Sequence, residues 1–124
     1  MVQSPDTEPK FEGISPLFPV SDVGAALAFY CERLGFEVGW TWSEPPTLAN
    51  VCRGDIDITL ALEPSKAGAG EAYVYLSGVD DYYAELRARG VAVGELDDRT
   101  YGMRDFALVD PDGNRLVFGA AIAG

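Results

Sequence analysis

The stretch that decides the fold is "YGMRDFALVDPDGNRLVFG", residues 101–119. Two segments rich in β-forming residues flank Asp-Pro-Asp-Gly-Asn, which is typical of a tight turn. Pro111 suits the second position of a turn, and Gly113 and Asn114 tolerate positive φ. The stretch therefore predicts a β-hairpin, in which Asp110 and Asp112 are turn residues and not catalytic carboxylates.

The elements before the hairpin follow one order twice. A strand at 13–20, a helix at 21–35 and strands at 36–42, 47–54 and 55–63 come first. After a glycine-containing loop, a strand at 71–77, a helix at 78–90, a short strand at 91–98 and the hairpin follow. The helical segments "SDVGAALAFYCERLGF" and "SGVDDYYAELRARGV" share a Ser-x-Val start and an arginine before the closing glycine. The repeat predicts an α+β fold of two βαβββ modules, about residues 13–63 and 71–119.

The length of 124 residues fits a single domain, expected at 11–124 after a flexible lead-in at 1–10. One helix covers only one face of each module's sheet. We therefore expect two sheets facing each other around a cleft, with the helices outside. The chain has no apolar run of roughly 20 residues and no signal-like start, so a cytoplasmic location without membrane contact is expected.

The amino-acid composition excludes some classes of ligand and of catalysis. Twenty acidic residues against nine basic ones give a net charge of −11, which disfavours nucleic-acid binding and favours cationic ligands, or serves solubility. There is no histidine, which excludes Ser-His-Asp and Cys-His catalysis. Cys31 and Cys52 form no Cys-x-x-Cys motif and are expected to be buried thiols, although one bridge is conceivable.

The motifs "VSDVGAALAFYCERLGF" and "DFALVDPDGNRLVF", with the βαβββ duplication, resemble the vicinal oxygen chelate superfamily of glyoxalases, extradiol dioxygenases and bleomycin-resistance proteins. The resemblance covers roughly residues 13–119. The bleomycin-resistance branch is the most similar. It implies an acidic homodimer without a catalytic metal, which sequesters a cationic glycopeptide antibiotic in clefts between its subunits.

The resemblance also places the metal ligands that other members use. They would fall on Ser15, on Glu71, on Val117 and, in some members, near Asp57 or Thr59. One certain carboxylate among these positions does not supply the three protein ligands of a typical catalytic site. No metal and no cofactor is therefore expected.

The cleft is expected to have aromatic walls and a few carboxylates. If Glu71 faces the cleft, the period of two sends Tyr73 and Tyr75 there, while Ala72, Val74 and Leu76 pack under the helix. The other expected ligand-binding residues are Asp57, Thr59, Trp40, Trp42, Leu17 and Val117. The tyrosines and tryptophans could instead be core or dimer-contact residues. Arg104 and Asp105 are expected to pair with each other on the surface.

Three functions stay open. A metal-free binding protein would sequester a cationic or aromatic antibiotic-like ligand by stacking and charge. An enzyme of the lyase or isomerase type would use Glu71 or Asp57 as a general base, its pKa raised among the tyrosines. An interaction or sensor module would have its cleft filled by its own side chains. The missing metal ligands and the acidity favour the first.

Overall fold

A computed structural model of the chain describes residues 8–122 and contains two four-stranded sheets and two α-helices. The first module holds β1 (Leu17–Val20), α1 (Val23–Ala28), β2 (Glu37–Trp42), β3 (Leu48–Arg53) and β4 (Ile56–Leu62), and a π-helical turn (Phe29–Arg33) continues α1. The second holds β5 (Glu71–Tyr75), α2 (Val79–Ala88), β6 (Asp97–Asp98), β7 (Met103–Val109) and β8 (Arg115–Ala121). A short 3-10 helix (Pro64–Lys66) lies between them. The predicted α+β fold of two βαβββ modules is confirmed.

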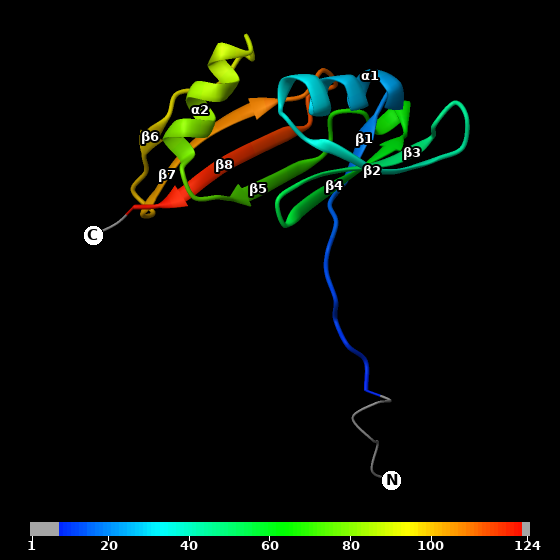
Figure 1. The fold of residues 1–124 in the computed structure, drawn as a ribbon, viewed down its shortest axis with the longest axis horizontal. Helices are drawn as coiled ribbons and strands as arrows, with labels where there is room; N and C mark the ends of the chain where they lie inside the picture. Colours follow the sequence, from blue (N-terminus) through cyan, green and yellow to red (C-terminus); the bar gives the residue numbers. More distant parts are fainter. Residues whose placement is uncertain (1–7, 123–124) are drawn as a thin grey trace.

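The two sheets have the same topology. Their strand orders are β1-β4-β3-β2 and β5-β8-β7-β6, with one parallel pair each, β1 with β4 and β5 with β8. Both helices lie on the same side of the sheets, and the N-terminal segment leaves the body on the other side (Figure 1). Each sheet therefore has one face toward the helices and one helix-free face.

One apolar core joins the modules on the helix side. Its largest fully buried side chains include Tyr30, Phe18, Phe106 and Phe118. Tyr82 of α2 packs against Phe118 and donates its hydroxyl to the Leu34 carbonyl at 2.8 Å. Apolar side chains from both modules thus bury one another, which neither module could do alone.

The hairpin that decides the fold also fastens the modules together. Asp110 is 3% exposed and accepts hydrogen bonds from the backbone N–H groups of Asp112 and Asn114, each at 2.9 Å. The same carboxylate accepts the Tyr30 hydroxyl of the other module at 3.0 Å. Asn114, fully buried, donates to the Pro19 carbonyl at 2.9 Å and accepts from the Gly70 N–H at 2.7 Å. Asp110 is a turn residue, as predicted.

Several local expectations change. Strand β1 begins at Leu17 and not at residue 13, and it is an edge strand, as its prolines suggested. Of the strand predicted at 91–98, only Asp97 and Asp98 pair. Upstream of them Gly94 donates to the Ala107 carbonyl at 2.7 Å, which holds the segment beside β7 without a ladder.

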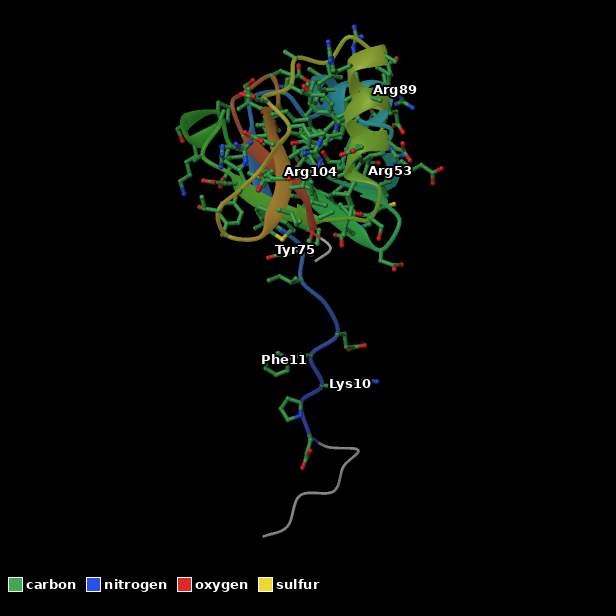
Figure 2. The ribbon with its side chains drawn as sticks, turned by 90° about the vertical axis from the view of Figure 1, so that its left-hand side faces the viewer. Lys10, Phe11, Arg53, Tyr75, Arg89 and Arg104 are labelled. Carbon is green, nitrogen blue, oxygen red and sulfur yellow. The ribbon has the colours of Figure 1, made fainter. Side chains whose placement is uncertain are left out.

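The ends of the chain and its cysteines complete the picture. Residues 1–7 of the lead-in expected at 1–10 lie outside the described residues. Phe11, just after the lead-in, is 97% exposed and stands clear of the body (Figure 2). Cys31 and Cys52 are half-buried and form no disulfide. No helix in the described part of the chain is long and apolar enough to cross a membrane.

Candidate functional site

The helix-free face of the second sheet carries a hollow of about 820 Å³. We call it the tyrosine hollow. It is lined by Glu71, Ala72, Tyr73 and Tyr75 of β5, by Arg99 and Tyr101 of the loop before β7, by Met103, Asp105 and Ala107 of β7, and by Arg115 and Val117 of β8. All of these residues belong to one module.

Strand alternation explains how β5 supplies this lining. Tyr73 and Tyr75 face the hollow, their ring centroids 5.0 Å apart, while Ala72, Val74 and Leu76 pack against the core. This is the alternation expected from the period of two. Tyr75 is 74% exposed, so much of its ring is available to a ligand.

A buried carboxylate forms the floor of the hollow. Asp105 is 3% exposed and accepts the hydroxyl of Tyr73 at 2.8 Å and the hydroxyl of Tyr101 on the same oxygen, Oδ2. Its other oxygen, Oδ1, accepts from Arg99 Nε at 2.8 Å. Sequence analysis missed this cluster and expected Asp105 to pair with Arg104. That expectation is wrong, because neighbouring residues on a strand point to opposite faces, and Arg104 pairs with Asp80 and Asp98.

The cluster fixes the protonation of its members. Burial alone would raise the pKa of Asp105, but the hydrogen bonds from Tyr101, Arg99 and Tyr73 outweigh it and hold that pKa below its ordinary value. Burial raises the pKa of Tyr73, and its hydrogen bond to Asp105 adds to this effect. The hydrogen bond that Tyr101 itself donates to Asp105 raises the pKa of Tyr101. At neutral pH the centre is an ionised carboxylate that accepts hydrogen bonds from two neutral phenols.

A tight turn aims Arg99 and Tyr101 at Asp105. The Arg99 N–H donates to the Met103 carbonyl at 2.7 Å, and Gly102 has a φ of 85°, a left-handed conformation that favours glycine. Gly119, the partner of Asp105 across the β7–β8 ladder, leaves space for Tyr73, since a Cβ there would lie 2.1 Å from the Tyr73 hydroxyl oxygen. A Gly in a strand beside an aromatic was the only sequence signal for this contact.

The charges in the tyrosine hollow are balanced, which the sequence did not predict. Arg115 pairs with Glu71 at 2.6 Å, and Arg99 pairs with Asp105. Glu71 is exposed and held by this arginine, so it lacks the desolvated surroundings that the general-base hypothesis required. Asp57, the alternative base, accepts from Asn50 Nδ2 at 2.7 Å.

A second cavity of about 520 Å³ adjoins the hollow across the tyrosine pair. This acidic groove is lined by Glu12, Gly13, Ile14, Pro16, Asp55, Ile56, Asp57, Ile58, Ala72, Tyr73, Val74 and Tyr75. It contains three carboxylates and no basic side chain among its lining residues. Figure 2 shows Tyr75 near the point where the N-terminal segment leaves the body. The tyrosine pair thus borders a charge-balanced hollow on one side and an acidic groove on the other.

The remaining predicted site residues lie on the helix-free face of the first sheet. Leu17, Thr59 and Trp40 share one row across the strands, because Leu17 pairs with Thr59, Thr59 with Asn50 and Asn50 with Trp40. Trp42 follows on the same face and is 68% exposed. Thr59 is buried, hydrogen-bonded to Ser15 Oγ at 2.8 Å. The structure gathers Glu71, Tyr73, Tyr75 and Val117 in the tyrosine hollow, with Asp57 in the adjoining groove. The other four predicted residues lie outside the linings of both cavities: Leu17, Trp40, Trp42 and Thr59.

The metal-ligand positions implied by the resemblance are likewise divided between the two sheets. Ser15 contacts Thr59, Glu71 contacts Arg115, and Val117 lines the hollow. Within residues 8–122, no three Cys, Asp or Glu side chains are grouped so that they could hold a metal ion. That the protein uses no metal and no cofactor stays a prediction.

Taken together, the fold and the site define a duplicated βαβββ protein with a ligand-sized, aromatic hollow on a helix-free sheet. The chain belongs to the Glyoxalase/Bleomycin resistance protein/Dioxygenase superfamily, whose family model matches residues 14–118. The recognition made from the sequence motifs is confirmed.

The proteins similar to this chain include bleomycin resistance and antibiotic-binding proteins. The bleomycin resistance protein of Geobacillus stearothermophilus is 26% identical over 121 residues, covering 83% of this chain and 92% of the relative. Among solved structures, the bleomycin-binding protein of bleomycin-producing Streptomyces verticillus, complexed with copper(II)-bleomycin, has a TM-score of 0.77 and 29% identity and covers 94% of this chain and 99% of that one. An antibiotic binding protein from Streptomyces sp. CB03234 has a TM-score of 0.73 and 27% identity and covers 89% of this chain and 97% of that one.

Proposed function

We propose that this protein binds and sequesters a cationic or aromatic antibiotic-like small molecule, with no metal or cofactor of its own. The observation that carries the proposal is the tyrosine hollow of about 820 Å³, a volume typical of small-molecule sites. Tyr73, Tyr75 and Tyr101 give it planar walls on which an aromatic ligand can stack. The relatives that bind bleomycin or another antibiotic support the same class of ligand.

The acidic groove is the place we assign to a positive charge on the ligand. Its three carboxylates, Glu12, Asp55 and Asp57, have no basic residue beside them among the lining residues, whereas the hollow pairs each carboxylate with an arginine. A ligand with an aromatic part and a cationic part would place the first in the hollow and the second in the groove, on either side of Tyr73 and Tyr75. Salt should weaken this binding.

We also propose that the protein acts as a homodimer. Leu17, Trp40 and Trp42 leave apolar surface exposed on the first sheet, and the hollow of the second sheet is open to solvent. A second copy that placed its first sheet over this hollow would cover both surfaces. It would also bring Trp40, Trp42 and Leu17 to the residues of the hollow, as the sequence analysis expected of one cleft.

The proposal is tested by titrating metal-stripped protein with a bleomycin-type glycopeptide in a calorimeter. We expect saturable binding in the micromolar range or tighter that weakens as salt is added. The double variant Tyr73→Ala/Tyr75→Ala should bind the glycopeptide roughly tenfold or more weakly, because two stacking surfaces are lost. No heat of binding by the folded protein would refute an antibiotic of this type as the ligand.

A matched control is Tyr83→Ala. Tyr83 lies on α2, contacts Phe106 on the helix side and does not line the hollow. This variant should lose stability but keep its affinity, so a loss of affinity confined to the Tyr73/Tyr75 variant cannot come from weaker folding. Circular dichroism of both variants checks that each is folded at the titration temperature.

The dimer is tested by light scattering and by tryptophan fluorescence. Trp42→Glu places a charge on the proposed contact surface and should shift the mass from dimer to monomer. In the dimer, Trp40 and Trp42 lie over the hollow, so glycopeptide binding should change their emission. A monomeric mass of the wild-type protein at micromolar concentration would refute the dimer and leave ligand binding to be judged by calorimetry.

A further inference from the structure

The direction of the hydrogen bonds around Asp105 has a consequence for any molecule that enters the tyrosine hollow. A carboxylate can only accept hydrogen bonds, and a phenol has a single proton to donate. Tyr73 and Tyr101 both direct that proton at Asp105 Oδ2. Each hydroxyl therefore keeps only oxygen lone pairs for other partners, and toward a ligand it can act only as an acceptor.

Arg99 keeps this arrangement in place. It donates from Nε to Asp105 Oδ1 and from Nη2 to the backbone carbonyls of Asp105, at 3.1 Å, and Glu95, at 2.8 Å. The guanidinium stabilises the ionised form of Asp105 without occupying Oδ2, and its hydrogen bonds fix its position. Asp105, 3% exposed, is thus an ionised carboxylate in a fixed position that orients two phenol protons.

We propose that Asp105 is a specificity-determining residue, which makes the tyrosine hollow select planar aromatic ligands whose edges carry N–H donors, such as aromatic amines, amidines or amides. A ligand that offered only acceptors at Tyr73 and Tyr101 would have to break a hydrogen bond to a charged carboxylate before it gained one. The inference rests on the proposed function, because it assigns the chemistry of the ligand at that same site.

The experiment compares two dyes that differ in their donors. Proflavine is a planar cation with two aromatic amino groups, and acridine orange is the same ring system with those amino groups dimethylated. Both carry one positive charge at neutral pH, so their difference in affinity reports mainly on the amino N–H donors. We expect the wild-type protein to bind proflavine roughly two- to tenfold more tightly, the value of about one hydrogen bond.

The decisive variant is Asp105→Asn. Arg99 Nε needs an acceptor at the Oδ1 position, so it should hold the amide oxygen there and leave the amide N–H groups facing Tyr73 and Tyr101. At least one tyrosine should then turn its proton away from residue 105 and become a donor toward the ligand. The proflavine preference should then fall toward one. Asp97→Asn is the matched control, because Asp97 pairs with Asp105 across the β6–β7 ladder and carries the same charge but does not line the hollow. It should keep the wild-type preference.

Gly119→Ala provides a second route to the same result. The new Cβ would lie 2.1 Å from the Tyr73 hydroxyl oxygen and 2.9 Å from Asp105 Cβ, so the Tyr73 side chain must move furthest and its hydroxyl is pushed away from the Asp105 carboxylate. The released hydroxyl can rotate, so the proflavine preference should also fall. If Asp105→Asn does not fold, this variant alone decides the question.

The outcomes separate the two proposals. A proflavine preference that is lost in Asp105→Asn or Gly119→Ala and kept in Asp97→Asn supports the role of Asp105. Equal affinity for both dyes in the wild type, or a preference unchanged in the folded variants, overturns this role and leaves ligand binding intact. Failure of the wild type to bind either dye, together with no binding of the glycopeptide, overturns both.

Discussion

Replacing Asn114 by alanine should destabilise this protein, because it removes a buried hydrogen-bond network at the turn that joins the two modules. Asn114 is fully buried, and its side-chain amide makes three hydrogen bonds. It donates to the Pro19 carbonyl and to Asp110 Oδ2, both at 2.9 Å, and accepts from the Gly70 N–H at 2.7 Å. Two of these three bonds reach segments outside the turn.

The size of the effect follows from the groups left behind. Pro19 O keeps a second donor in the Gly68 N–H, and Asp110 Oδ2 keeps the Tyr30 hydroxyl, but within residues 8–122 the Gly70 N–H has no other hydrogen bond. A buried donor without a partner costs about 1–3 kcal/mol, and each of the other two bonds contributes about 1 kcal/mol. We expect the free energy of unfolding to fall by about 3–5 kcal/mol, which lowers the Tm by on the order of 10–20 °C.

The assay is unfolding in urea, followed by circular dichroism, with Asp112→Ala as the control. Asp112 lies in the same turn and also joins the modules, since it accepts from the Ser21 N–H at 3.1 Å and the Ser21 hydroxyl at 2.7 Å. These contacts are exposed to solvent, so their loss should cost below about 1 kcal/mol. If Asn114→Ala costs no more than Asp112→Ala, burial of the amide network does not stabilise the module junction and the argument is wrong.

Two further predictions concern the cluster of charges where the helices end. Gly35→Ala should destabilise the protein more than Gly54→Ala: both positions have positive φ, 76° and 58°, but only a Cβ at Gly35 meets other atoms, Arg53 Nη1 at 2.5 Å, whereas nothing lies within 4 Å of one at Gly54. Urea midpoints compare the two, and equal losses would mean that Arg53 moves aside freely. The second prediction is a pH dependence. The hydrogen bond from Arg53 holds the pKa of Glu85 below its ordinary value of 4.5, so the pair stabilises the folded state above that pH and loses its effect as the pH falls through the lower folded-state pKa. Glu85→Gln should therefore cost below about 1 kcal/mol at neutral pH and progressively less as the pH falls below 4.5; a constant difference between the two proteins would show that charge is not the cause.

Much of the fold could be predicted because its signals are local. The turn sequence at 110–114, the alternation in β5 and β8 and the helical spacing each depend on residues a few positions apart. Ser21 and Asp22 both precede the helical pattern and could cap it, and the structure shows that Asp22 caps α1 through the Ala25 N–H at 2.9 Å. Period two also predicted that Tyr73 and Tyr75 lie on the face of β5 that points away from the helix.

The candidate site was harder to predict because it depends on strand register. The side chains of Trp40, Trp42 and Leu17 lie on the face of their strands that the alternation predicts, as the tyrosines do. They belong, however, to the other sheet. Nothing in the periodicity of a strand says which sheet face of the other module it will meet. The predicted residues were therefore divided between two faces, and whether a second copy reunites them is a matter for the mass measurement proposed above.

By itself, the sequence determined the order of the elements, the duplication of the modules, the turn and which side chains of each strand leave the core. Only the tertiary structure decided that Asp105 is buried under two phenols and held by Arg99, although these residues are within 32 positions of one another in the chain. The physical reason is that hydrophobic periodicity fixes the direction of a side chain relative to its own strand. Its partner depends on the register of the neighbouring strands and on the space left by a residue such as Gly119, which only the assembled sheet defines.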